Sequence, residues 1–261
     1  MLLIRRQLAQ TEAMRGRYPG LSDVAYSFGP GKLTPAVKAI MIANAAVFVL
    51  TFFAPSLIVQ FGLRPADLFG QFAVYQLVTY MFVHASLSHV FFNMLTLWFV
   101  GVELERMWGT RYFSRYYFAC GIGAGLTQVL LGIMPLPFAG QFYYPSTVGA
   151  SGAIYGLLLA FALYYPTRPF LVFFIFPVQG RYFVMILGGI ALLFSLGGGS
   201  GVAHTAHLGG LVSGYLYLKG KRLNLISEIQ YRYLKWRINR MRKKFDVYSG
   251  GRRDDYDRRV H

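Results

Sequence analysis

Two polar residues, Ser151 and His207, lie in apolar parts of the sequence and could act together as a nucleophile and its base. Ser151 lies in Gly149–Gly156, which reads Gly-Ala-Ser-Gly-Ala-Ile-Tyr-Gly, and His207 lies in Ala203–Gly210. A serine hydroxyl becomes a strong nucleophile when a histidine within hydrogen-bond reach accepts its proton. Polar side chains are costly in apolar surroundings, so they are candidates for function. The pair therefore predicts nucleophilic catalysis on a carbonyl group.

The spacing of glycines indicates how the two side chains could meet. Gly152 and Gly156 lie four residues apart, and so do Gly210 and Gly214. Helices with small residues at this spacing can pack with their backbones in close contact. If these two faces pack together, the serine and the histidine cluster lie at one end of the contact. In the alternative interpretation, Ser151 is only one more small residue that allows helices to pack.

The histidine cluster offers two candidate bases, His204 and His207. His207 lies three residues before Gly210 and therefore shares the glycine face of a helix. His204 lies closer to the preceding loop, where water can solvate it. The spacing favours His207 as the base.

His89 and Asn93 form a second polar pair, four residues apart and thus on one face of a helix. Both side chains can donate hydrogen bonds, as can the backbone N–H of Ser151 at the start of a helix. Such donors stabilise the negative charge that develops on a carbonyl oxygen during acyl transfer. Alternatively, His89 and Asn93 are a structural pair between helices. For His84, which lies five residues before His89, we predict a structural role.

The pattern of acidic residues limits the mechanism. A zinc protease would show His-Glu-x-x-His, which this sequence lacks. Apart from Glu103, the last residue of the stretch 84–103, the apolar stretches contain no aspartate or glutamate that could orient a histidine. We therefore predict a serine–histidine dyad in place of a triad, with no metal and no cofactor.

These residues must be positioned by membrane-spanning helices. Of the 261 residues, 55% are hydrophobic and only 14% are charged, whereas soluble domains carry roughly 25% charged residues. Long uncharged stretches predict an all-α membrane protein. We place its six spans at about 36–54, 84–103, 112–133, 148–165, 181–197 and 203–218.

The basic residues predict the orientation of these spans. The three loops expected on the side away from the termini contain Arg64 and no other lysine or arginine. Basic residues concentrate in cytosolic loops, so both termini should be cytosolic. We expect the membrane to be a bacterial inner membrane. The net charge of +16 then reflects orientation, not nucleic-acid binding. The predicted organisation is a cytosolic lead-in (1–34), a six-span domain (35–219) and a basic cytosolic tail (220–261).

Three segments outside the spans are predicted to lie at the membrane surface or close to it. Residues 55–75 are apolar but interrupted by prolines and glycine, which indicates an interfacial loop. The short apolar stretch 170–177 either lies at the interface or leads into the fifth span. The tail from 220 onward has apolar residues at helical spacing. It is predicted either to lie on an anionic membrane surface or to form a solvated helix.

Taken together, these motifs resemble those of the rhomboid intramembrane proteases, over roughly residues 36–218. The matching motifs are His-x-x-x-Asn in the second span, Gly-x-Ser-Gly (Gly149–Gly152) in the fourth and Ala-His-x-x-Gly-x-x-x-Gly in the sixth. The resemblance implies a six-transmembrane-helix rhomboid bundle. By resemblance, Ser151 is the nucleophile, His207 is the base, and His89 and Asn93 contribute to the oxyanion hole.

Further residues match the family pattern or depart from it. Tyr155 matches a tyrosine that packs on the catalytic histidine, Gly149 and Gly152 support the nucleophile, and Glu105-Arg106 resembles the charged pattern that closes the second span. The family often has Trp-Arg before the second span, where this chain has Tyr75-Gln76.

The resemblance implies cleavage of transmembrane or membrane-proximal segments of other membrane proteins, with small residues at the cut. The partners would be these substrates and the lipid bilayer, with no nucleic acid. Two other classes of function remain as alternatives. One is an inactive rhomboid-like protein that binds membrane clients, and the presence of both Ser151 and His207 argues against it. The other is a six-span transporter, for which intramembrane carboxylates or repeat symmetry would be typical.

Overall fold

Long apolar helices make up most of the computed structural model, which describes residues 30–135, 137, 139–172, 176–196, 201–223, 233–238 and 240. The long helices are Pro35–Phe53 (α2), Leu87–Thr96 (α6), which continues through the π-helical turn Leu97–Gly101 (η3) into Val102–Trp108 (α7), Thr110–Ile133 (α8), Ser151–Tyr164 (α10), Gly180–Leu196 (α11) and Gly201–Leu223 (α12). Each predicted span coincides with one of these helices. The predicted helical membrane class is confirmed, while the number of membrane crossings stays a prediction.

Length and composition distinguish two groups among these helices. Among the described residues, three helices are long and apolar enough to cross a membrane: Pro35–Phe53, Leu87–Trp108 and Thr110–Ile133. Two further apolar helices, Ser151–Tyr164 and Gly180–Ser195, are shorter. A straight crossing needs about 20 residues, so these shorter helices would need their flanking segments to complete a crossing.

Local chemistry sets where two of the site-bearing helices begin. The predicted second span starts at 84, but α6 begins at Leu87 because the Ser86 Oγ accepts a hydrogen bond from the His89 N–H at 3.2 Å, as an N-cap does. The predicted fourth span starts at 148, but α10 begins at Ser151. Gly149 has a φ of +114°, which is incompatible with a right-handed helix.

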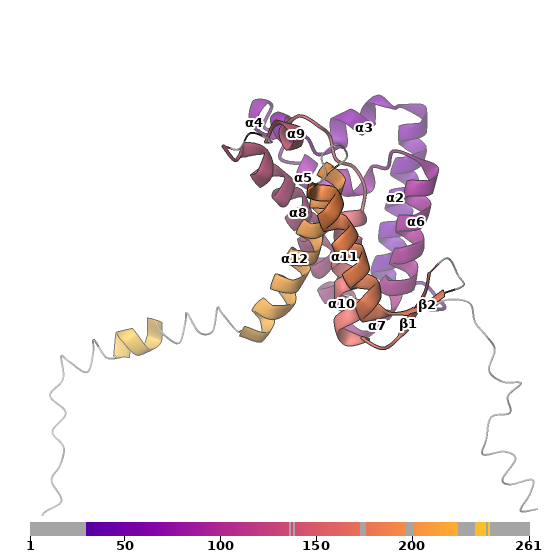
Figure 1. Ribbon diagram of the computed structural model, residues 1–261, viewed down its shortest axis with the longest axis vertical. Helices are drawn as coiled ribbons and strands as arrows, with labels where there is room; N and C mark the ends of the chain where they lie inside the picture. The colour runs from indigo at the N-terminus through magenta and orange to yellow at the C-terminus, as the bar shows by residue number, and fades with distance from the viewer. Residues whose placement is uncertain are drawn as a thin grey trace, which may run out of the picture. The chain divides into compact units, whose positions relative to one another are not determined.

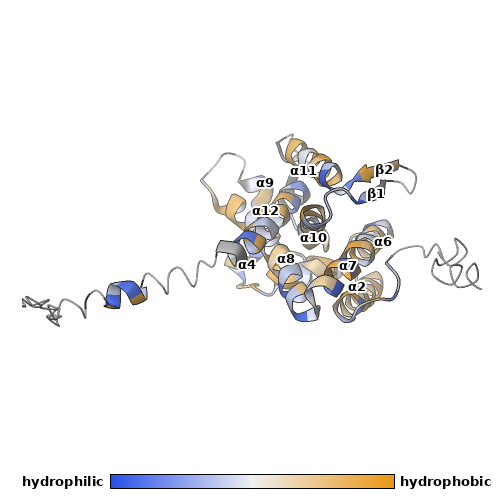
Figure 2. Cartoon of the chain, turned by 90° about the horizontal axis from the view of Figure 1, so that it is seen from below, coloured by the Kyte–Doolittle hydropathy of each residue, from blue (hydrophilic) through white to orange (hydrophobic). Residues whose placement is uncertain are grey.

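Helix α10 lies at the centre of the bundle. It contacts α6, α8 and α11, and in the view of Figure 2 it lies in the middle of the surrounding helices. Ala153, Leu157 and Ala160 on this helix are fully buried. An element that is apolar on all sides belongs in the interior of a helical protein, and this position places the start of α10 inside the bundle.

The connections gather at the two ends of the long helices (Figure 1). At one end lie Ser56–Phe61 (α3), Pro65–Gly70 (α4), Gln76–Thr79 (α5), the 3₁₀ turn Tyr80–Phe82 (η2) and Gly140–Tyr143 (α9). The backbones of Leu63 and Thr147 exchange two hydrogen bonds of 2.8 Å, which joins the two long loops at this end. The predicted interfacial loop 55–75 is therefore a chain of short helices that does not span.

The opposite end holds α7 and a small antiparallel sheet of Pro169–Val172 (β1) and Phe176–Gln179 (β2). Val172 pairs with Phe176, and Pro169 pairs with Gln179. We did not predict a hairpin in the stretch 170–177. Its apolar and aromatic residues suit a pleated surface. Each residue pairs with one that lies four to ten residues away, which satisfies the backbone hydrogen bonds without a helix.

A buried carboxylate ties α2 to α7 at this end. Glu105, which is 2% exposed, accepts hydrogen bonds from the backbone N–H groups of Ala36 and Val37, each at 2.9 Å. The hydroxyls of Thr34 and Thr110 donate to the same carboxylate. The first N–H groups of a helix have no partner within the helix, so Glu105 both caps α2 and fixes it against the bundle.

The chain divides into two compact units, Met1–Tyr215 and Leu216–His261. The second unit contains the end of α12 and the helical residues 233–238, where Tyr233 stacks on Trp236 with 6.0 Å between ring centroids. Residues 1–29 of the predicted lead-in and Ile226 and Ile229 of the predicted amphipathic tail lie outside the described residues. The predicted domain limits at 34 and 219 stay predictions.

Candidate active site

The start of α10 and the first half of α12 bring Ser151 and His207 together. The His207 Nε2 lies 2.7 Å from the Ser151 Oγ, which is a strong hydrogen-bond distance. Both side chains are half-buried. The geometry suits proton transfer from the hydroxyl to the imidazole.

Glycine packing accounts for this close approach. A Cβ added to Gly210 would overlap the carbonyl oxygen of Gly152, and one added to Gly214 would lie 3.2 Å from the Cα of Gly156. The predicted contact between the two glycine faces is confirmed. Because α10 and α12 meet backbone to backbone, two short side chains at the end of the contact can reach one another.

The ring of Tyr155 holds the imidazole from one side. Tyr155 lies one turn after Ser151 and stacks on His207 with 4.2 Å between ring centroids and 7° between the ring planes. Within the described part of the chain, the buried His207 Nδ1 has no hydrogen-bond partner and thus no carboxylate that orients the ring. Stacking therefore supplies the orientation that an aspartate gives the histidine of a triad.

His204 has a different environment. Its ring stacks on Phe194 of α11, with 5.0 Å between centroids, and meets the His207 ring edge-on at 5.8 Å. It is His207 that contacts the Ser151 hydroxyl, as the spacing to Gly210 indicated.

His89 and Asn93 of α6 face the turn that precedes Ser151. A Cβ on Gly149 would lie 2.7 Å from the His89 Nε2 and 3.7 Å from the Asn93 Nδ2. The Asn93 Nδ2 is buried and has no hydrogen-bond partner in the described part of the chain. Two side-chain donors and the N-terminus of α10 thus border one small space, which is the arrangement that an oxyanion hole requires.

The same turn explains the need for glycine at 149. Its positive φ is unfavourable for any residue with a Cβ, and the imidazole of His89 occupies the space that a side chain would need. The sequence motif contains this glycine, but its close contact with His89 could not be derived from spacing.

Two further residues brace this turn. The Ala150 N–H donates to the His84 Nε2 at 3.4 Å, and the His84 ring meets that of His89 edge-on at 4.9 Å. Tyr80, which our sequence reasoning missed, accepts a hydrogen bond from the Gly149 N–H through its carbonyl at 2.8 Å. Its buried hydroxyl donates to the Gly121 carbonyl at 2.6 Å. Nothing in the spacing of Tyr80 separated it from the other aromatic residues.

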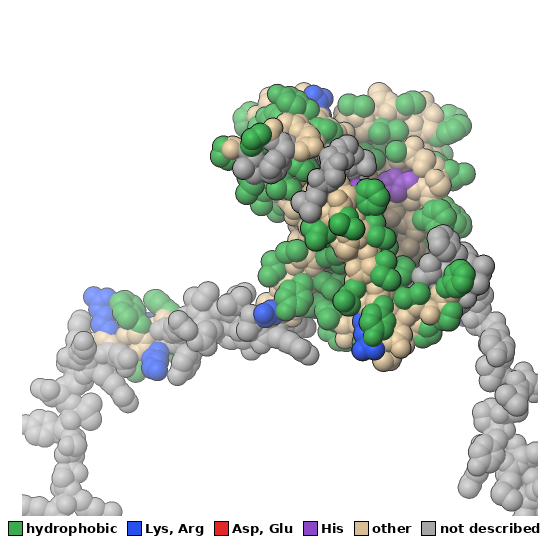
Figure 3. All heavy atoms as spheres, in the orientation of Figure 1, with side chains coloured by type: hydrophobic (Ala, Val, Ile, Leu, Met, Phe, Trp, Pro, Cys, Tyr) green, Lys and Arg blue, Asp and Glu red, His purple; other side chains and the backbone are tan. Residues whose placement is uncertain are grey.

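A cavity of about 200 Å³ opens beside Ser151. Its wall includes Tyr80, His89, Thr147, Gly149 and His207. Figure 3 shows a face covered by apolar side chains, with histidine visible in a hollow between the helices. The nucleophile can thus be reached from outside the bundle.

The fold and the site define a helical membrane protein with a hydrogen-bonded serine–histidine pair at the start of its central helix. The sequence profile of the rhomboid domain matches residues 71–221, more than half of the chain. The chain belongs to the rhomboid family, as its motifs predicted.

Individual relatives agree with this assignment. The chain is 31% identical over 158 residues to rhomboid protease GluP of Bacillus subtilis, covering 60% of this chain and 28% of the relative. It is 27% identical over 183 residues to the mitochondrial RHOMBOID-like protein 12 of Arabidopsis thaliana, covering 67% and 54%. It is 32% identical over 178 residues to rhomboid-like protease 1 of Toxoplasma gondii, covering 66% and 56%. The matched part thus spans between about a quarter and just over half of these relatives.

Proposed function

We propose that this chain is an intramembrane serine endopeptidase in which Ser151 is the nucleophile and His207 the general base. The observation that carries the proposal is the 2.7 Å contact between the His207 Nε2 and the Ser151 Oγ. Family membership supports the same chemistry, because rhomboid proteins include proteases that act within the membrane.

In the first half-reaction, the Ser151 Oγ attacks the scissile carbonyl carbon while its proton moves to the His207 Nε2. The carbonyl oxygen becomes negatively charged and accepts hydrogen bonds from His89, Asn93 and the Ser151 backbone N–H. Collapse of this intermediate breaks the C–N bond, and the imidazolium gives its proton to the leaving amine. The product is an acyl-enzyme on Ser151.

In the second half-reaction, a water molecule gives a proton to His207 and attacks the ester carbon. The imidazolium then returns a proton to the Ser151 Oγ as the new carboxylic acid leaves. Tyr155 keeps the imidazole in place through both steps, because its ring is parallel to that of His207.

The substrates we propose are membrane proteins cut in or near a transmembrane segment. The cavity beside Ser151, about 200 Å³, is smaller than the 300–1,000 Å³ typical of drug-sized ligand sites. Its size favours a small side chain at the cut. We also propose that both termini are cytosolic, which places the active site toward the opposite face of the membrane.

Active-site labelling tests the proposal directly. The purified chain should react with a fluorophosphonate probe at Ser151, and Ser151→Ala should lose both the label and the cleavage of a transmembrane substrate. Ser114→Ala, which removes a half-buried serine hydroxyl on α8 that donates to the Thr110 carbonyl, is the matched control and should keep both. Absence of labelling in a folded wild-type chain would favour a client-binding protein or a transporter.

A further inference from the structure

The loop between α2 and α6 contains two charged side chains, Arg64 and Asp67. They are the only charged residues in the three loops at the active-site end of the long helices. A single charged pair in otherwise uncharged loops indicates a specific function at that position, because charges that only keep loops soluble would be spread more evenly.

Arg64 and Asp67 neutralise one another only partly. The Arg64 Nη1 lies 3.7 Å from the Asp67 Oδ1, which is beyond hydrogen-bond distance. The Arg64 Nε is buried and has no hydrogen-bond partner among the described residues. A guanidinium has five N–H donors, and those on the two Nη atoms of this partly exposed side chain remain for a ligand. The two side chains are 38% and 13% exposed.

These two residues line a cavity of about 440 Å³ together with Gln60, Gln71, Tyr75 and Gln76. This volume lies within the range of small-molecule sites. The cavity is separate from the one beside Ser151, and the two share no lining residue.

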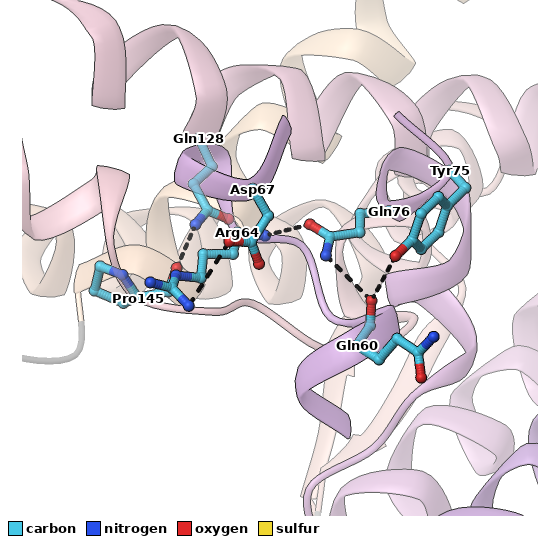
Figure 4. A network of polar contacts seen from close by, with 7 residues as sticks. All are labelled: Gln60, Arg64, Asp67, Tyr75, Gln76, Gln128 and Pro145. Atoms are coloured by element: carbon cyan, nitrogen blue, oxygen red, sulfur yellow. Dashed lines mark hydrogen bonds and ion pairs between the residues drawn. The ribbon is translucent and has the colours of Figure 1, made fainter. Parts of the chain in front are cut away.

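Hydrogen bonds from two neighbouring residues hold the wall of this cavity in place (Figure 4). The Gln76 amide donates to the Gln60 carbonyl at 3.1 Å and accepts from the Arg64 N–H at 3.0 Å. The Tyr75 hydroxyl donates to the same Gln60 carbonyl at 3.3 Å. Tyr75-Gln76 stands where the family often has Trp-Arg. The neutral side-chain amide of Gln76 holds two parts of the loop together, because its oxygen bonds to Arg64 and its nitrogen to Gln60.

We propose that this cavity binds the headgroup of a zwitterionic phospholipid, with the phosphate at Arg64 and the ammonium at Asp67. A guanidinium suits phosphate because its donors match two oxygens at once, and a carboxylate attracts an ammonium. An anionic headgroup lacks the ammonium and would be repelled by Asp67. Val59 and Tyr75 also line the cavity and are 59% and 47% exposed, which provides apolar contact for the glycerol and upper acyl chain.

The cavity also lies next to the active-site turn along the backbone. Arg64 follows Leu63, whose backbone pairs with Thr147, and Thr147 lines the cavity beside Ser151. A bound headgroup should therefore stabilise the loop that supports the catalytic turn. The proposal rests on the proposed membrane orientation but not on peptidase activity.

Native mass spectrometry of the full chain in detergent micelles tests the proposal. Phosphatidylethanolamine and phosphatidylglycerol with identical acyl chains are added in turn. The wild type should retain phosphatidylethanolamine at least about tenfold better than Arg64→Gln, because a charged hydrogen bond typically contributes that much. Asp67→Asn should lose the preference for phosphatidylethanolamine over phosphatidylglycerol. Arg168→Gln, which breaks an arginine–carboxylate pair with Glu103 elsewhere, is the matched control and should behave as wild type.

Three outcomes would overturn the proposal. Equal retention of both lipids by the wild type and all variants would show only nonspecific lipid. If inorganic phosphate alone raised the melting temperature of the wild type as much as phosphatidylethanolamine does, the cavity would be a site for anions and not for a lipid headgroup. Loss of substrate binding in Arg64→Gln with unchanged lipid retention would assign the cavity to the substrate protein. Repeating the lipid measurement on Ser151→Ala separates this result from any failure of the proposed catalysis, since that variant should retain lipid as the wild type does.

Discussion

Replacing Glu105 with glutamine should destabilise the helix bundle by about 3–6 kcal/mol. The carboxylate accepts two hydrogen bonds on each oxygen. Three of the four donors belong to α2 or to the residue just before it, and the fourth is Thr110 at the start of α8. Glutamine keeps one oxygen and places an NH₂ group against two donors. Hydrogen bonds to a buried charged group contribute about 1.5–3 kcal/mol each, so losing two gives the stated range.

Glu103→Gln on the same helix is the matched control. Glu103 pairs with Arg168 at 3.2 Å, with the two side chains 22% and 48% exposed. Such surface pairs contribute about 0–1 kcal/mol, so this substitution should have little effect. The free energy of unfolding is measured for both variants by reversible unfolding in mixed micelles of mild detergent and dodecyl sulfate.

The comparison of the two variants decides whether the Glu105 network stabilises the bundle. A loss below about 1 kcal/mol for Glu105→Gln, or equal losses in both variants, would refute the reasoning from buried hydrogen bonds. The folded fraction of Glu105→Gln should still be labelled at Ser151, because the network caps α2 at the end of the helices away from the catalytic turn.

Three further outcomes are expected. Asn93→Ala should lower kcat about tenfold to a hundredfold with little change in KM. This loss is smaller than the one typical for removal of an oxyanion donor, because His89 remains. A large fall in melting temperature with unchanged single-turnover acylation would instead make Asn93 structural. Gly149→Ala should reduce acylation more strongly than Asn93→Ala, since the new Cβ collides with His89 at a positive φ; a variant with wild-type rates would contradict the tight turn. Reporter fusions should place the chain near Gly140 outside and the chain after Asp246 in the cytosol, and an exported C-terminus would contradict the proposed topology.

Local patterns in the sequence were enough to predict the helices and to single out the candidate site residues. Apolar stretches long enough to cross a membrane are contiguous, so they can be recognised without knowledge of any neighbour. The choice of His207 over His204 followed from its spacing to Gly210, because residues three apart share a helix face. Small residues at a spacing of four predicted the contact of α10 with α12, which the structure confirms.

Only the tertiary structure identified the residues that act across long separations in sequence. Tyr80 braces Gly149 through its backbone, Glu105 caps a helix that begins 70 residues earlier, and Leu63 pairs with Thr147. Each contact joins two segments that lie far apart in the sequence, and no repeating pattern of residues marks them as partners. Many other pairings were therefore equally compatible with the sequence. The positions of these residues are decided by helix packing, which determines which buried donor meets which acceptor.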